Sequence, residues 1–323
     1  MFVLVAANMA FPVPLLADFL SSAVVSVQYH DPRRVTLTVH SGAMDRDVLV
    51  EVLIAADSEV PRPNLYLLLG VGGGADGATW FSRSDAQEFF AGKNVNVIMP
   101  LGGQASYYAD WEIDDYRFGR QRWKTFLTEE LPPLMDVFLK SNGRNAIAGY
   151  SMSATSALAL AATTGGLYSS VASYSGCAQI SDPIGHEFVR LTLSVERREL
   201  VDIERMYGPA GSPRWAENDP YVQAERLRGK SIYISNGSGL PGEFDQLGGK
   251  YTLPGLSGFA DQLIFGGVIE AGANYCARNM QTRLESLGIP ARYNFTAVGT
   301  HSWGYWNSAL ADSWPTLAPP LRV

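Results

Sequence analysis

Apolar and polar positions follow a two-residue period early in this chain and continuous apolar runs later. Residues 35–39 and 47–54 alternate, which predicts two half-buried strands joined as a hairpin. Residues 65–69 form a continuous apolar run, typical of a strand buried on both faces of a parallel sheet, and residues 95–100 are predicted to form another central strand. Further strands are predicted at residues 145–148, 167–175, 231–235 and 292–295.

Helical spacing separates most of these strands. It predicts helices over residues 81–90, 123–139, 154–162 and 268–287, with Pro132 and Pro133 kinking the second or opening a new helix. Residues 182–229 are expected to be irregular, and residues 236–265 to form a long glycine-rich loop. Strands alternating with helices after an antiparallel hairpin predict an α/β fold, with a mostly parallel central sheet covered by helices on both faces.

The chain shows no linker, internal repeat or low-complexity segment, which predicts a single domain over residues 18–323. Residues 1–17 carry no charge and are mostly apolar, and they are too short to span a membrane. They resemble the apolar part of a secretory signal without its basic leader, so we expect an exported protein. The alternative is an N-terminal segment packed on the body of a cytosolic protein.

Composition narrows the possible partners. The net charge is −7 and no basic run is present, which argues against nucleic acid as a partner. Cys177 and Cys276 are far apart in sequence and could form a disulfide in an exported protein or remain two buried thiols in a cytosolic one. Neither has a Cys or His neighbour at ligand spacing, so no metal site is predicted, and no motif implies an organic cofactor.

The strongest chemical signal is Gly-Tyr-Ser-Met-Ser at residues 149–153, between a predicted strand and a predicted helix. A strand-to-helix turn of this kind is the nucleophile elbow of α/β-hydrolases, which predicts that fold and makes Ser151 the nucleophile. The last position departs from Gly-x-Ser-x-Gly, but Ser153 is still small. Ser151 would lie at a helix N-terminus, which favours a developing negative charge. The alternative is a serine-rich turn without chemistry.

The general base must follow the acid and the nucleophile in chain order. His30 and His40 precede Ser151, and His186 follows it too closely to leave room for an acid. His301 comes after the last predicted strand, where this fold places its base, and it is therefore the predicted base.

The acid is less well defined by pattern alone. There are four candidates, and the sequence pattern barely distinguishes between them: Glu243, Asp245, Asp261 and Glu270. Glu270 lies in an apolar stretch without an obvious ion-pair partner, so a carboxylate there needs a specific partner such as imidazole. The alternative for Glu270 is a capping role in the first turn of a helix.

An oxyanion hole in this fold uses the N–H after the nucleophile and one from the loop after an early central strand. These are predicted to be the N–H groups of Met152 and Val71. Val71 lies in the glycine-rich residues 70–74, where Gly70 and Gly72 would let the backbone approach the substrate. A P-loop or a dinucleotide site is disfavoured, because the Gly-Lys-Ser/Thr ending and the acidic residue of those motifs are missing.

Several longer sequence motifs resemble those of a known family. They are Pro-Leu-Gly-Gly-Gln at 100–104, Tyr-Tyr-Ala-Asp-Trp at 107–111, Trp-Lys-Thr-Phe-Leu-Thr-Glu-Glu-Leu-Pro at 123–132, Ala-Gly-Tyr-Ser-Met-Ser-Ala at 148–154, Met-Tyr-Gly-Pro at 206–209, Asn-Asp-Pro at 218–220 and Gly-Thr-His-Ser-Trp-Gly-Tyr-Trp at 299–306. With these motifs, which span roughly residues 35–317, the chain resembles the mycolyltransferase family, the antigen 85 complex and its relatives in mycolate-bearing actinobacteria.

The resemblance implies an α/β-hydrolase fold, export to the cell envelope and transfer of mycoloyl chains between trehalose esters. It implies Glu270 as the acid, the amides of Val71 and Met152 as the oxyanion hole, and Trp303 as a residue lining the sugar and acyl site. Implied partners are acylated trehalose or another acyl ester as donor, and a sugar, an envelope glycan or water as acceptor, close to the outer lipid layer. No metal or organic cofactor is implied.

One departure affects the expected substrate. Better-known members read Leu-Asp-Gly-Leu-Arg after the early central strand, and the Asp and Arg contact the sugar; here residues 68–72 read Leu-Leu-Gly-Val-Gly. Cys177 and Cys276 resemble a pair in the corynebacterial-type branch, which implies a disulfide. Two alternatives stay open: a secreted carboxyl or lipid esterase without a sugar acceptor, and a non-catalytic envelope adhesin on the same fold.

Overall fold

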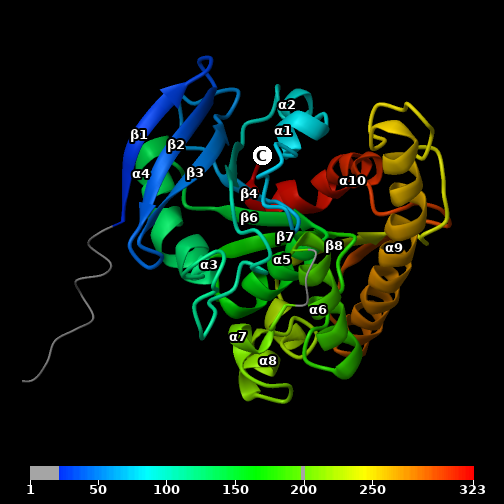
Figure 1. Cartoon of the computed structure of the whole chain (residues 1–323). Coiled ribbons are helices and arrows are strands. Elements are labelled where there is room, and N and C mark those ends of the chain that lie inside the picture. Colours follow the sequence, from blue (N-terminus) through cyan, green and yellow to red (C-terminus); the bar gives the residue numbers. More distant parts are fainter. Residues whose placement is uncertain (1–21, 198–200) are drawn as a thin grey trace, which may run out of the picture.

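A nine-stranded sheet forms the middle of the molecule, in the order β1-β2-β3-β5-β4-β6-β7-β8-β9 (Figure 1). The computed structural model describes residues 22–197 and 201–323, so the signal-like segment expected at residues 1–17 lies outside the described residues. The strands are β1 (Ala23–Tyr29), β2 (Arg34–Ser41), β3 (Arg46–Leu53), β4 (Asn64–Leu68), β5 (Asn96–Pro100), β6 (Asn145–Tyr150), β7 (Tyr168–Tyr174), β8 (Ser231–Asn236) and β9 (Arg292–Phe295).

The sheet is antiparallel at one edge and parallel elsewhere. β1, β2 and β3 pair in antiparallel fashion, and β3 is antiparallel to β5. All pairings from β5 through β4, β6, β7 and β8 to β9 are parallel. Both the opening hairpin and the mostly parallel sheet are therefore confirmed, and β1 is an additional edge strand that the pattern did not predict.

Burial along the strands explains the two sequence patterns. β2 alternates between buried and partly exposed residues, as a strand with one covered face should. Every residue of β4, β5 and β6 is buried, which is why residues 65–69 of the β4 region read as a continuous apolar run.

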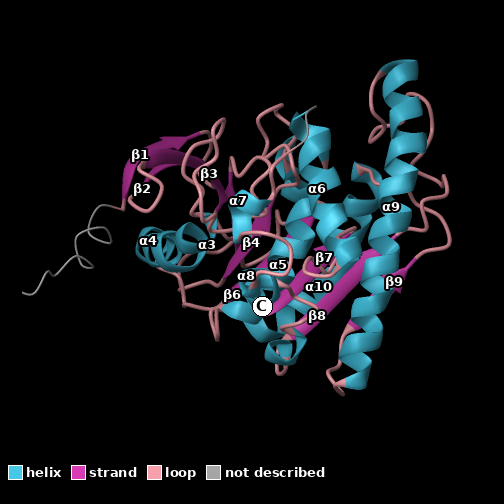
Figure 2. Cartoon of the chain, turned by 60° about the horizontal axis from the view of Figure 1, so that its bottom comes forward, coloured by secondary structure: helices cyan, strands magenta, loops and turns pink. Residues whose placement is uncertain are grey.

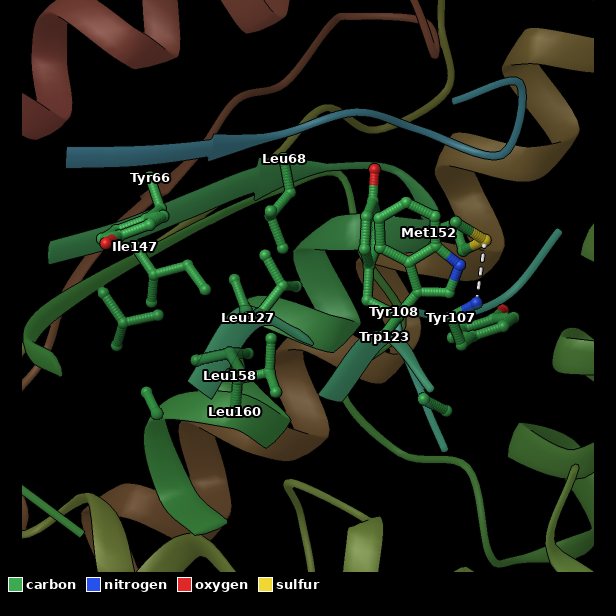
Figure 3. Packing of buried hydrophobic residues seen from close by; sticks show 14 of the residues in the cluster. Tyr66, Leu68, Tyr107, Tyr108, Trp123, Leu127, Ile147, Met152, Leu158 and Leu160 are labelled. Atoms are coloured by element: carbon green, nitrogen blue, oxygen red, sulfur yellow. Dashed lines mark hydrogen bonds between the residues drawn. The ribbon is translucent and has the colours of Figure 1, made fainter. Parts of the chain in front are cut away.

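Two apolar layers cover the two faces of the sheet. Tyr66 and Leu68 of β4 point into one layer, which also contains residues of α3 (Trp123–Thr125), α4 (Leu131–Leu139) and α5 (Met152–Thr163) (Figure 3). Leu65 and Leu67 point into the other, with residues of α1 (Trp80–Arg83), α2 (Ala86–Phe89) and α10 (Trp303–Leu321). Successive residues of a strand face opposite sides, so a single buried strand serves both layers.

The helical region predicted over residues 123–139 is divided, and of the two outcomes expected at Pro132 and Pro133, a kink or a new helix, the structure has the new helix. α3 passes into a π-helical turn (Phe126–Glu130), and α4 then begins with Pro132 and Pro133 in its first turn. Proline is tolerated in the first turn because the N–H groups there have no partner within the helix. The region predicted as a helix over residues 81–90 is likewise two short helices, α1 and α2.

Two expectations of irregular structure were wrong. Residues 182–229 contain α6 (Pro183–Arg197), α7 (Glu204–Tyr207), α8 (Pro213–Asn218) and a 3₁₀ turn (Ala224–Leu227). The loop expected over residues 236–265 ends earlier, because α9 (Gly255–Ser286) begins well before residue 268. Glycines at 255, 258, 266 and 267 lower the helix propensity of this stretch, and tertiary packing overrides it.

The two edge strands of the sheet and the long helix α9 lie at the sides of the molecule. β1 lies at one edge and β9 at the other, with α9 running along the side of the molecule beside β9 (Figure 2). Among the helices that the structure describes, none combines the length and apolar character needed to cross a bilayer.

Candidate active site

Ser151 stands on a strained turn between β6 and α5. Its backbone adopts φ 57° and ψ −127°, an unusual conformation for a residue with a side chain. The Ser151 N–H donates to the carbonyl of Tyr174 at the end of β7, 2.9 Å away. This strained strand-to-helix turn is the geometry expected of a nucleophile elbow.

The residues flanking Ser151 explain how the turn closes. A Cβ on Gly149 would lie 2.5 Å from the carbonyl oxygen and the hydroxyl of Ser153, so only glycine fits there. The buried Ser153 hydroxyl donates to the Tyr150 carbonyl at 2.9 Å and accepts from the Tyr150 N–H at 3.0 Å. Ser153, where the usual motif has glycine, therefore adds hydrogen bonds that hold the elbow.

His301 meets Ser151 from the loop after β9. Its Nε2 lies 2.7 Å from the Ser151 hydroxyl oxygen. The backbone N–H of His301 donates to the carbonyl of Gly266 on α9, 3.3 Å away, and its ring lies against the edge of Trp306 at 5.1 Å between centroids. The imidazole is thus held by both the backbone and the packing.

Glu270 is the carboxylate that reaches the imidazole. One of its oxygens lies 2.8 Å from Nδ1 of His301, and the other accepts from the Ser175 hydroxyl at 2.9 Å and the Gly237 N–H at 2.6 Å. The Glu270 side chain is completely buried. It lies in the middle of α9 rather than in its first turn, so a capping role for Glu270 is wrong.

The other carboxylates proposed as the acid lie elsewhere. Glu243 and Asp261 are exposed. Asp245 is buried and accepts from the Gly242 N–H, the Gln262 amide, the Thr300 hydroxyl and the Tyr305 hydroxyl, at 2.5–2.9 Å. Because Thr300 and Tyr305 flank His301 in the chain, Asp245 fixes the loop that carries the imidazole instead of contacting it.

Sequence reasoning did not identify the groups that support the triad. Ser175 lies directly after β7 and also accepts from the indole N–H of Trp306 at 3.0 Å. Its only sequence signal is its position at the carboxyl end of a strand beside the nucleophile strand. Gly237 has the same signal, because it directly follows β8.

A cavity of about 180 Å³ opens beside Ser151. Its wall is largely apolar, and the residues lining it are Val71, Tyr107, Ser151, Met152, Thr155, Ser175, Cys177, Phe188, Leu191, Thr192, Val268, Ile269 and His301. Val71 and Met152, the two expected oxyanion donors, therefore share this cavity with the nucleophile. Met152 is the first residue of α5, so its N–H has no acceptor within the helix.

Gly70, Gly72 and Trp303 do not belong to that lining. A Cβ on Gly70 would lie 2.7 Å from the ring of Tyr150, so this glycine allows the loop after β4 to approach the elbow strand. Gly72 accepts a hydrogen bond from the Ala75 N–H within the loop. The Trp303 ring is buried against Trp80, Tyr150 and Trp306 beneath the site.

Cys177 and Cys276 form a disulfide between the segment after β7 and α9. The pairing implied by the family resemblance is therefore present. Cys276 lies on the same helix as Glu270, and Cys177 lines the cavity, so the bond joins two walls of the site.

The remaining histidines lie away from the site. His40 contacts Asp47, and His30 contacts Thr36, both on the antiparallel strands. His186 packs against Trp215 at 4.5 Å between ring centroids, and burial lowers its pKa. Within residues 22–197 and 201–323, no cluster of His, Cys, Asp and Glu side chains is arranged to hold a metal ion.

The non-catalytic alternative predicts a dispersed triad, which the geometry contradicts. Ser151, His301 and Glu270 form one continuous series of contacts, at 2.7 and 2.8 Å.

Known proteins resemble this chain in sequence. The family model described as putative esterase matches residues 41–317. The diacylglycerol acyltransferase/mycolyltransferase Ag85B of Mycobacterium intracellulare is 32% identical over 292 residues, covering 88% of this chain and 82% of the relative. The corresponding Ag85A of Mycobacterium leprae is 33% identical and covers 87% and 81%.

Solved structures resemble it in fold. MPT51 (FbpC1) of Mycobacterium tuberculosis superimposes with a TM-score of 0.73 at 24% identity, covering 89% of this chain and 100% of that one. An S-formylglutathione hydrolase from Agrobacterium tumefaciens gives a TM-score of 0.63 at 14% identity, covering 92% and 100%. These similarities show the α/β fold shared with serine hydrolases.

Proposed function

The chain belongs to the putative-esterase family and, within it, to the Ag85 mycolyltransferases, and from this membership we propose a serine acyltransferase acting through an acyl-enzyme at Ser151. The acyl group is a long chain of the mycoloyl type. The donor is acylated trehalose or a related ester, and the acceptor is a second trehalose ester or another hydroxyl of the envelope.

The series of contacts from Ser151 through His301 to Glu270 carries the proposal. His301 takes the Ser151 proton on Nε2 as the hydroxyl oxygen attacks the ester carbonyl, and it returns the proton to the leaving alcohol. Glu270, which accepts from Nδ1, holds the imidazole in the tautomer with a free Nε2 and stabilises the imidazolium. The acceptor hydroxyl then repeats both steps in reverse and releases Ser151.

The negative charge that develops on the carbonyl oxygen needs donors that are already in place. We assign the N–H groups of Val71 and Met152 to this role, because both residues line the cavity beside Ser151. Loss of one such donor typically raises the barrier by about 3–4 kcal/mol. The helix dipole of α5 acts in the same direction.

The lining of the cavity supports a long apolar acyl group. Phe188 and Leu191 of α6 face Val268 and Ile269 of α9 across the space beside Ser151. Burying methylene groups contributes about 0.8 kcal/mol each, so an acyl chain gains affinity with every carbon that enters.

A secreted lipid or carboxyl esterase is the second candidate. Residues 68–72 offer no charged side chain to a sugar, which removes the contacts that the family's Asp and Arg supply. Water would then resolve the acyl-enzyme in place of a sugar hydroxyl. Either activity fits an exported envelope protein, and the Cys177–Cys276 disulfide supports an oxidising compartment.

Mass spectrometry of the intact protein tests the proposal. Incubation with a long-chain p-nitrophenyl ester should add one acyl group at Ser151, and Ser151→Ala should remain unmodified. Labelling of the Ser151→Ala variant would refute the assignment. Product analysis with a trehalose monoester then separates the candidates: trehalose diester indicates transfer, and free acid alone indicates hydrolysis.

A further inference from the structure

The first two-thirds of α9 are unusually poor in charge. Residues 255–276 contain only Asp261 and Glu270 as charged side chains, and Glu270 is buried in the triad. A surface helix normally presents charged and polar residues to water. This part of α9 therefore lacks the outer polar face that its position at the side of the molecule calls for (Figures 1 and 2).

The outward side chains form a continuous stripe. Ile264, Phe265, Val268 and Tyr275 are 62%, 65%, 72% and 52% exposed. Separations of three, four and seven residues place them on one face of a helix. We call these four residues the α9 apolar face. Ala271, between Val268 and Tyr275 on the same face, is also exposed.

The α9 apolar face is continuous with the catalytic cavity. Val268 belongs to both, because it is exposed on the outside and also lines the space beside Ser151. Across the cavity, Leu191 of α6 also lines it and is 50% exposed. The rim between α6 and α9 is thus apolar from the outer surface down to the nucleophile.

Large exposed apolar side chains in contiguous groups mark binding surfaces. The helical period places charged residues only at the two ends of this face, Asp261 before Ile264 and Arg278 after Tyr275, so the surface between them fits an uncharged, apolar partner. A second protein copy seated here would cover the rim between Val268 and Leu191 and block acyl chains from the cavity. A hydrocarbon surface would cover the same residues and also deliver such chains.

We propose that the α9 apolar face docks the protein on a lipid layer, so that an acyl chain passes from the layer between α6 and α9 to Ser151. This inference rests on the proposed function for the lipid nature of the donor. Docking on a lipid layer does not depend on acyl transfer at Ser151, so the docking proposal and the proposed function can be refuted separately.

Vesicle flotation tests the docking. The probe is a large unilamellar vesicle of neutral phosphatidylcholine, and the protein is the full chain carrying Ser151→Ala, which removes turnover. The test variant is Ile264→Gln with Phe265→Gln, two residues outside the cavity lining. The matched control is Val137→Gln, an 81% exposed apolar residue on α4.

We expect the Ser151→Ala protein with an unaltered α9 apolar face to float with the vesicles. The double variant should bind the vesicles at least about tenfold more weakly, and the Val137→Gln variant should bind as the parent does. With Ser151 restored, hydrolysis of soluble p-nitrophenyl acetate should be unchanged by the double substitution, whereas turnover of a long-chain ester held in vesicles should fall.

Three results would overturn the inference. One is no flotation of the parent protein, and another is equal loss of binding in the control variant. The third is a dimer in lipid-free buffer that the double variant converts to a monomer, because the face would then be an interface between copies. If flotation behaves as expected but no acyl-enzyme forms with Ser151 present, the proposed function fails and the docking stands.

Discussion

Replacing Glu270 by Gln removes one charge from the active site and leaves the side-chain volume almost unchanged. One Glu270 oxygen accepts from two donors, the Ser175 hydroxyl and the Gly237 N–H, and the other oxygen accepts from Nδ1 of His301. The amide of Gln must place its oxygen toward the two donors, because an NH₂ group there would face the Gly237 N–H at 2.6 Å.

That orientation directs the amide NH₂ at His301. The imidazole can accept this bond on Nδ1 only by moving its proton to Nε2, the atom that must take the proton of Ser151. Trapping the wrong tautomer in this way typically lowers kcat by about 10⁴-fold, which corresponds to about 5 kcal/mol of barrier. Ser175→Ala, which removes one donor but leaves the carboxylate, should reduce kcat far less.

The assay is hydrolysis of a soluble p-nitrophenyl ester, with active-site titration by a phosphonate to count competent Ser151. Urea unfolding monitored by circular dichroism establishes that the Glu270→Gln variant is folded. A folded Glu270→Gln enzyme that keeps kcat within about tenfold of the parent would refute the tautomer argument and the assignment of Glu270 as its partner.

Four further expectations follow from the same contacts. Replacing Cys177 and Cys276 by Ala should lower the free energy of unfolding by about 4–5 kcal/mol on the chain-entropy model, since the bond spans 99 residues; an unchanged urea midpoint would contradict it. Asp245→Ala should lower kcat/KM for a soluble ester by about tenfold or more, because the loop carrying the imidazole loses its anchor, and full activity in the folded variant would show that the anchor is dispensable. Gly149→Ala should destabilise the protein by about 1–3 kcal/mol in thermal unfolding, because the new Cβ meets the next turn at 2.5 Å, and an unaltered melting temperature would argue against this crowding. Because burial lowers the pKa of His186 in the folded state, the unfolded chain binds its proton first; stability should therefore fall as pH drops below about 6.5, and His186→Gln should flatten this slope in urea titrations.

The sequence predicted the strands well, because the period of apolar positions reflects local burial. The residues of β4 read as an apolar run because both of their faces are covered. Two of the helices were harder to locate from the sequence than the strands. α6 was missed in a stretch that looked irregular, and the start of α9 was hidden by its glycines, because helix propensity is a weak signal that packing overrides.

Within the site, the sequence by itself singled out Ser151 and His301 as the proposed nucleophile and base. The turn around Ser151 is a local feature, and His301 is the one histidine that lies late enough in the chain. The choice of acid required the folded structure. Asp245 and Glu270 are both buried carboxylates that lie between Ser151 and His301 in the chain, and local pattern cannot say which one faces the imidazole.

The folded structure makes that choice through contacts between distant segments. Ser151 and His301 are 150 residues apart, and α9 brings Glu270 to the imidazole while Asp245 binds the flanking loop. The apolar outer face of α9 was also undetectable from sequence, since an apolar helix is normally read as buried. Periodicity records how much of each residue is covered, whereas only the packed chain decides which residues cover it.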